Sequence, residues 1–230
     1  MIWTRLFTAA AQLFGPPTSA DGRGTAGSVE DAPVAAALIA LGAKMAKADG
    51  EVRPEDVAAF EQVFKAEPNS RAMVQRFFRL ARQTTLGFER YARRVARHFR
   101  ARPAALEDVM DGLFHIALAD GILTRDENDY LARVAEIFGF SESEYGRLKA
   151  THIGRDANDP YLILAIDETV TDEELKKAYR RAAAANHPDR IISRGLPPEM
   201  TGLATHKMAM INRAYAQIKA QRKKERAILL

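Results

Sequence analysis

Residues 171–189 read TDEELKKAYRRAAAANHPD. The first four residues are a capping box of the form T-x-x-E, and they place three carboxylates at the positive end of the helix that they start. Pro188 disfavours helical geometry for the residue before it and has no N–H to donate. The stretch therefore predicts a helix over about 172–185, followed by a loop that bears His187-Pro188-Asp189.

The predicted helix has an apolar stripe and a basic ridge on its opposite side. The stripe consists of Leu175, Tyr179, Ala182 and Ala183. The ridge is solvated and consists of four cations at i and i+4 spacing, Lys176, Lys177, Arg180 and Arg181. A further helix over about 203–222 carries Met208, Ile211, Ala214, Tyr215 and Ile218 at helical spacing. We expect two antiparallel helices, with Tyr161 and Leu164 packed across their base.

Four segments in this part of the chain carry a resemblance. In order they are D-P-Y-x-x-L from Asp159, L-K-K-A-Y-R-R from Leu175, H-P-D-R from His187 and I-N-R-A-Y from Ile211. In order and spacing they resemble the J-domain of DnaJ-type co-chaperones, which would occupy residues 158–230. The resemblance implies that His187, Pro188 and Asp189 contact a DnaK-type chaperone and stimulate its ATP hydrolysis. It also implies that Lys176, Lys177, Arg180 and Arg181 meet acidic residues on the chaperone's nucleotide-binding domain.

The preceding part of the chain, residues 32–153, has apolar residues at a period near 3.6 and no sustained alternation of period two. It predicts seven helices over about 32–49, 54–66, 70–83, 86–101, 103–120, 125–138 and 142–150. An internal repeat has an offset of 71 residues, because residues 46–52 reappear as 117–123. Each copy is a helix, a tight Asp-Gly turn and a second amphipathic helix, and two such hairpins can pack into one bundle.

The paired A-D-G-x-[VL] turns resemble the TerB family of tellurite-resistance-associated helical domains. The resemblance implies an all-helical interaction domain whose acidic turn residues are metal ligands. An EF-hand is excluded, because loop positions 1 and 3 would lack ligand oxygens. Two interpretations remain open. Either the aspartates cap their turns and Gly50 and Gly121 take positive φ, or a divalent metal is shared by Asp49, Asp56, Asp120 and Glu127. No other cofactor is expected.

The first 31 residues divide into an apolar segment, 1–14, and a linker rich in glycine and small residues, 15–31. As a helix the apolar segment would reach only about 21 Å, against a hydrocarbon core of about 30 Å. An interfacial anchor, a packed chain end and a signal peptide are the alternatives for it. Three glycines of the linker match GxGxxG, but no strand precedes them, so a nucleotide site is not expected there.

Composition and charge limit the remaining function classes. The chain has no cysteine, which excludes disulfides and zinc fingers and suits a reducing compartment. Its net charge of +4 equals the excess in residues 158–230, where 13 Lys and Arg face 9 Asp and Glu. A basic surface favours an acidic partner. Nucleic acid is the weaker interpretation, because Arg90, Arg93, Arg94, Arg97 and Arg100 come without a base-reading module.

Taken together, the residues favour an all-α protein with a TerB-like helical bundle and a small J-domain. The loop Gly195-Leu196-Pro197-Pro198-Glu199-Met200 extends the minimal J-domain. With the apolar N-terminus and the TerB-like middle, it resembles the DjlA type of membrane-associated DnaJ-like proteins. We expect a cytoplasmic co-chaperone and not an enzyme. If residues 1–14 act as an anchor, the protein is attached to the inner face of the membrane. The TerB-like domain would select an unnamed client or a location, and a metal-responsive regulator is the alternative.

Overall fold

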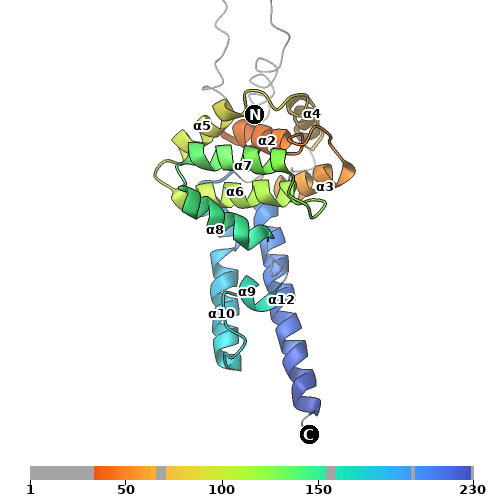
Figure 1. The fold of residues 1–230 in the computed structure, drawn as a ribbon. Coiled ribbons are helices and arrows are strands. Elements are labelled where there is room, and N and C mark those ends of the chain that lie inside the picture. The colour runs from red at the N-terminus through yellow and green to blue at the C-terminus, as the bar shows by residue number, and fades with distance from the viewer. Residues whose placement is uncertain (1–33, 66–70, 154–158, 198–199, 229–230) are drawn as a thin grey trace, which may run out of the picture.

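A computed structural model describes residues 34–65, 71–153, 159–197 and 200–228. Over these ranges the chain is helical and has no strand, which confirms the predicted all-α class. The helices are α2 (Val34–Met45), α3 (Pro54–Val63), α4 (Arg71–Ala81), α5 (Phe88–His98), α6 (Pro103–Ala117), α7 (Arg125–Phe138), α8 (Glu142–Ile153), α9 (Pro160–Ile163), α10 (Asp172–Ala185), α11 (Pro188–Ser193) and α12 (Thr201–Ile228). Helices α2 to α8 form an N-terminal bundle, and α10 and α12 form a helical pair that projects from it (Figure 1). The segments predicted for residues 1–14 and 15–31 lie outside the described residues.

Helix α2 is the centre of the N-terminal bundle. Eleven of its residues, Ala35 to Met45, are buried, and it contacts α4, α5, α6 and α7. The side chains on α2 are mostly small, so the neighbouring chain approaches closely. At Gly42, for example, an added Cβ would lie 2.7 Å from the Phe64 ring. All seven helices predicted between residues 32 and 153 are present, and α7 has the predicted bounds.

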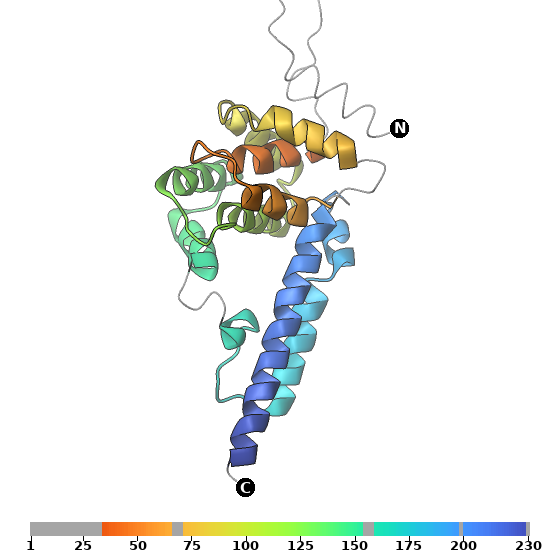
Figure 2. The same cartoon turned by 90° about the vertical axis from the view of Figure 1, so that its right-hand side faces the viewer.

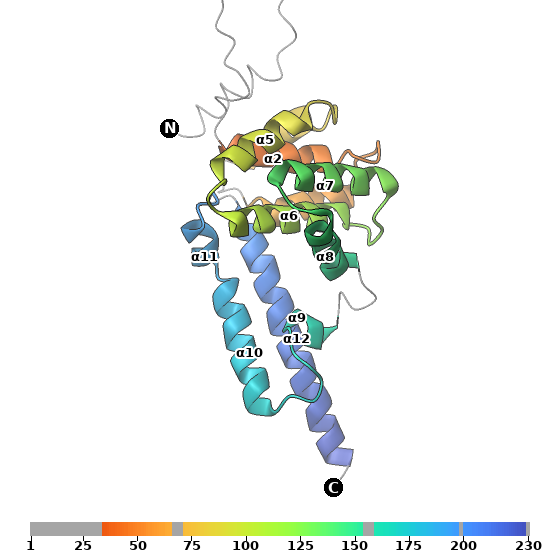
Figure 3. The same cartoon turned by 60° about the vertical axis from the view of Figure 1, so that its left-hand side comes forward.

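The helical pair has a small core of its own. Helices α10 and α12 run antiparallel, and α9 packs against α12 (Figure 3). The core contains Tyr161, Leu164, Leu175, Ile211, Ala214 and Ile218, which confirms the predicted packing of Tyr161 and Leu164. Helix α12 is longer than predicted and continues to Ile228. The predicted end near residue 222 was wrong because the basic residues that follow are good helix formers.

The segment between the two long helices belongs to the first core. Ile191, Leu196, Met200, Leu203 and Ala204 are buried in the same cluster as α2 and α6. The first turns of α12 contact α3, so the helical pair is joined to the bundle by packing as well as by the chain (Figure 2). The buried residues between Ile191 and Ala204 therefore complete the core of the N-terminal bundle. We call residues 191–204, which include the loop that lengthens the J-domain, the plug. No helix in the described part of the chain is both long and apolar enough to cross a membrane.

Candidate functional site

The basic ridge lies on α10, whose start follows from the predicted capping box. The Thr171 side chain accepts from Glu174 N, and the Glu174 carboxylate accepts from Thr171 N at 2.8 Å. Leu175 and Ala178 are buried against α12. The four predicted chaperone-binding cations, Lys176, Lys177, Arg180 and Arg181, are all exposed. The ridge is thus a solvated cationic surface, as the sequence predicted.

One aromatic contact fixes how α10 sits on α12. The Tyr179 ring stacks on that of Tyr215, with centroids 4.3 Å apart. The Tyr179 hydroxyl donates to Asn212 Oδ1 at 3.0 Å. These contacts set the rotation of α10 about its own axis, and that rotation keeps the basic ridge facing solvent.

The tripeptide His187-Pro188-Asp189 lies where α10 ends and α11 begins. His187 is the N-cap of α11, and its Nδ1 accepts a hydrogen bond from Asp189 N at 3.3 Å. Pro188 occupies the first helical position. In the neutral ring, Nδ1 as acceptor leaves the proton on Nε2. The cap therefore presents a hydrogen-bond donor on the far side of the imidazole.

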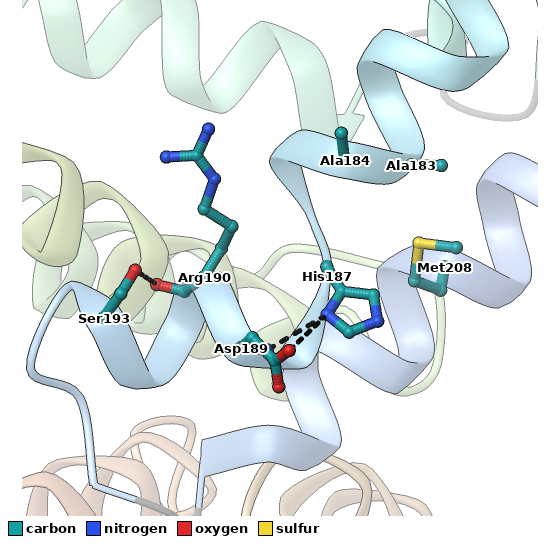
Figure 4. Close-up of a pocket in the computed structure, with 7 residues that line it drawn as sticks. All are labelled: Ala183, Ala184, His187, Asp189, Arg190, Ser193 and Met208. Carbon is teal, nitrogen blue, oxygen red and sulfur yellow. Dashed lines mark hydrogen bonds and ion pairs between the residues drawn. The ribbon is translucent and has the colours of Figure 1, made fainter.

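Both polar side chains of the tripeptide face solvent. His187 is 56% exposed and Asp189 is 87% exposed, with His187 Nδ1 3.5 Å from Asp189 Oδ2. They border an open hollow of about 540 Å³ that Ala183, Ala184, Arg190, Ser193 and Met208 also line. Figure 4 shows the His187 ring between Asp189 and Met208, while Arg190 extends away from it. A partner can thus reach the imidazole, the carboxylate and an apolar floor together.

The site is held in place by contacts that the sequence did not predict. Helix α11 is anchored by Ile191, which is 2% exposed and packs in the bundle core. Arg194, the residue after α11, donates to Asp108 Oδ2 at 2.5 Å. Lys207 of α12 donates to Asp108 Oδ1 at 3.2 Å and also to Asp111. The segment that follows the tripeptide is therefore tied to α6 by Arg194 and Lys207.

Asp111 and Lys207 keep their charges at this junction. Burial alone would raise the pKa of Asp111, but the hydrogen bond from His152 and the charge of Lys207 outweigh it and lower this pKa to about 2. Burial opposes the charge of Lys207, yet Asp111 and Asp108 raise its pKa. An ion pair in which both partners stay charged resists separation, because moving one partner leaves the other charge without compensation. In the sequence, the only signal for the contacts at this junction was the spacing of Leu196, Met200 and Leu203, which is typical of buried residues.

The four residues predicted as metal ligands lie at the two Asp-Gly turns. Gly50 and Gly121 have φ of 97° and 84°, and Asp49 and Asp120 accept from the backbone two residues on. This confirms the turn-capping interpretation. Arg53 joins the turns, because Nη1 donates to Asp120 Oδ2 at 2.6 Å and Nη2 lies 3.6 Å from Asp49 Oδ2.

The other two predicted ligands serve as helix caps. Asp56 accepts from Arg53 N at 2.8 Å, and Glu127 accepts from Thr124 N at 2.8 Å. Burial raises the pKa of Asp56 and of Glu127, and the neighbouring aspartates add to the effect. Among the described residues no three His, Asp or Glu side chains are grouped so as to hold a metal ion. The metal site stays a prediction.

Two family models match the chain in succession. Residues 35–150 match the model described as tellurite resistance protein TerB, and residues 159–227 match the DnaJ domain. The DnaJ match includes the basic ridge, the tripeptide and α12. Both matches agree with the resemblances that the motifs carry.

Full-length relatives join the two matches in one protein. A co-chaperone protein DjlA of Coxiella burnetii is 30% identical over 198 residues, which cover 77% of this chain and 73% of the relative. The chain belongs to the DjlA family of co-chaperones. The DjlA protein of Photobacterium profundum is 28% identical over 204 residues, covering 77% of this chain and 74% of that protein. The DjlA protein of Shewanella oneidensis is 34% identical over 118 residues, covering 46% and 45%. No solved structure matches the chain.

The two matches show to which domain the plug belongs. The TerB match ends at residue 150 and the DnaJ match begins at 159, so the plug at 191–204 lies wholly inside the DnaJ match. A segment of the J-domain is thus what completes the core of the TerB-like bundle in this DjlA-family chain.

Proposed function

We propose that the protein binds a DnaK-type chaperone through the basic ridge and the His187-Pro188-Asp189 tripeptide, and that it stimulates ATP hydrolysis by that chaperone. The DnaJ match over residues 159–227 carries the proposal. The exposure of the tripeptide on a fixed helix start supports it, because a preformed surface loses little entropy on binding. In this proposal the protein catalyses no reaction of its own and acts through the chaperone's ATPase.

The ridge and the tripeptide would have separate tasks. Exposed cations steer association with an acidic surface and depend on ionic strength. His187 and Asp189 offer directional hydrogen bonds, which set the orientation of the complex. We expect ridge variants to weaken binding and tripeptide variants to remove stimulation.

The test is single-turnover ATP hydrolysis by a DnaK chaperone from a bacterium carrying a DjlA relative. Wild type should raise the rate, and His187→Gln should not. Replacing Lys176, Lys177, Arg180 and Arg181 together by Gln should weaken apparent affinity about tenfold, because exposed ion pairs contribute about 0.2 to 1 kcal/mol each. Lys223→Gln with Lys224→Gln is the matched control and should behave as wild type. Equal stimulation by wild type and His187→Gln would contradict the proposal.

The N-terminal bundle and residues 1–14 would supply location or client choice. Residues 1–14 are apolar, with Trp3, Phe7 and Phe14 among them, which supports a peripheral anchor on the inner face of the membrane. The comparisons do not favour a metal-responsive or nucleic-acid-binding regulator. Deleting residues 1–14 should move part of the protein from the membrane to the soluble fraction of lysed cells, while leaving chaperone stimulation unchanged. An unchanged distribution would exclude the anchor.

A further inference from the structure

Helix α5 carries a row of exposed arginines. Arg90, Arg93 and Arg97 follow one another at spacings of three and four residues, so they share one side of α5, and Arg100 lies in the turn that follows the helix; all four are exposed. The opposite side of α5, with Tyr91, Ala92 and Val95, is buried. We call these four residues the arginine row.

The charge around the arginine row is one-sided. Residues 71–100, which include α4 and α5, contain nine arginines and one acidic residue, Glu89. The chain as a whole carries only +4, so the rest of the protein is acidic on balance. Helices α4 and α5 both pack on α2 and lie at the end of the bundle that is farthest from the helical pair (Figures 1 and 2). One end of the molecule is thus strongly cationic.

A fixed apolar side chain lies directly before α5. Leu86 is 81% exposed and is the most exposed large hydrophobic residue in the described part of the chain. Its loop is firmly held, because Lys44, 1% exposed, donates from Nζ to Thr84 O at 2.6 Å and to Leu86 O at 3.1 Å. Leu86 N also donates to Thr84 Oγ1 at 3.1 Å. The backbone is therefore held in place while the Leu86 side chain stays in solvent, four residues before the first arginine of the row.

We propose that the arginine row and Leu86 bind the anionic surface of a lipid bilayer. Cationic side chains next to an exposed apolar side chain are the pattern of interfacial membrane binding, in which the charges meet headgroups and the apolar group enters the acyl boundary. Duplex nucleic acid would use the charges but would have no role for Leu86. The membrane therefore accounts for both features.

The orientation of the molecule fits this partner. With α5 on the bilayer, the helical pair would extend away from the surface (Figure 3). The tripeptide and the basic ridge would then remain open to a soluble chaperone. The surface and the chaperone site do not compete.

The short separation in sequence between the apolar N-terminal segment and α2 also fits a membrane partner. Nineteen residues, 15–33, separate residues 1–14 from α2, and they can span at most about 65 Å. Helix α2 packs directly on α5. One weak apolar anchor gives only marginal membrane binding, and a basic patch is a common second signal. The arginine row adds a second membrane contact to the peripheral anchor proposed above for residues 1–14. It should bind anionic lipid even without residues 1–14.

The experiment uses the full chain and vesicles of phosphatidylcholine, with and without phosphatidylglycerol, in a sedimentation assay. Wild type should bind the mixed vesicles far better than the neutral ones, and salt should weaken that binding. Replacing the whole arginine row by Gln should lower the partition coefficient at least tenfold, because each Arg near an anionic surface contributes a factor of about five. Leu86→Asn should lower it by a smaller factor. The matched control, with Lys176, Lys177, Arg180 and Arg181 replaced by Gln, should bind vesicles as wild type does.

Four outcomes would overturn the inference. The arginine-row variant binds as wild type does, or the control variant loses as much binding as the arginine-row variant. In the third, wild type prefers duplex DNA and leaves the vesicles when duplex is added. In the fourth, binding is lost only on deletion of residues 1–14, which would support the anchor of the proposed function and refute the arginine row. Unchanged chaperone stimulation by the arginine-row variant would show that it is folded.

Discussion

Lys207 of α12 donates a hydrogen bond to Asp108 of α6 at 3.2 Å, across the junction between the J-domain and the bundle. Only 4% of the Asp108 side chain is exposed. The same carboxylate accepts from Arg194 on its other oxygen. Asp108 of the bundle therefore binds both the end of α11, through Arg194, and α12, through Lys207.

Asp108→Ala should destabilise the protein strongly. Removing one partner of a buried ionic group costs about 3 to 5 kcal/mol, because the remaining charges lose their compensation. Arg194 and Lys207 are partly exposed, so water relieves part of this and we expect about 2 to 3 kcal/mol. Urea unfolding followed by circular dichroism measures it. Glu107→Ala is the control, since Glu107 is an exposed neighbour on α6, and a loss at Asp108 no larger than at Glu107 would contradict the prediction.

Gly202→Ala should loosen α12 from α3. A Cβ at Gly202 would lie 2.0 Å from the Gln62 carbonyl oxygen and 2.8 Å from that of Val63. Both are backbone atoms, so α12 must shift, and overpacking of this kind costs about 1 to 3 kcal/mol. Gly146→Ala on α8 is the matched control, because its Cβ would meet nothing within 4 Å. The control should stabilise by about 0.5 to 1 kcal/mol, since Ala is the better helix former. The melting temperatures of the two variants should therefore move in opposite directions.

Local signals made much of the fold predictable from sequence. Thr171 and Glu174 fix the start of α10, and the Asp-Gly turns fix the break between the two helices of each hairpin, because caps and positive φ depend on neighbours in sequence. The basic ridge followed from the same helix. Helix α11 was missed because Pro188 was interpreted only as a terminator, although proline at the first position also favours a new helix.

Contacts between distant segments were not predictable in the same way. Leu196, Met200 and Leu203 have spacing that fits burial, but spacing does not say which core they enter. The junction charges likewise lie 86 to 99 residues apart in sequence. The net charge of the first 157 residues did not reveal the basic end of the bundle, because acidic residues elsewhere in this range balance the arginines of residues 71–100.

The junction should weaken in mild acid. The His115 ring lies 4.1 Å from that of His206 and hydrogen-bonds Gln62 of α3. Burial and the neighbouring His206 lower the pKa of His115 to about 4, and burial and Arg213 lower that of His206. The folded state thus binds fewer protons than the unfolded chain, whose histidines titrate near 6.5. Stability should be full above about pH 6.5 and should be lost as pH falls toward 4.

The measurement is the free energy of unfolding as a function of pH, for wild type and for His115→Gln with His206→Gln. The double variant should lose the part of the slope that lies between pH 6.5 and 4. The Asp111 carboxylate should contribute little there, because its lowered pKa keeps it ionised. His187→Gln is a suitable control, since His187 is exposed and outside the junction. Identical slopes for wild type and the double variant would show that these rings do not titrate with folding.

Arg53 should determine whether the Asp-Gly turns respond to divalent ions. Its guanidinium lies between Asp49 and Asp120, in the position where a shared cation would neutralise both. Wild type should therefore keep the same melting temperature when Ca²⁺ or Mg²⁺ is added. Arg53→Gln leaves the carboxylates facing one another, so it should melt at a lower temperature and recover with either ion. Arg125→Gln removes a far more exposed pair with Asp129 and should show neither effect. A rise in the melting temperature of wild type with Ca²⁺ would instead favour the metal site at Asp49, Asp56, Asp120 and Glu127.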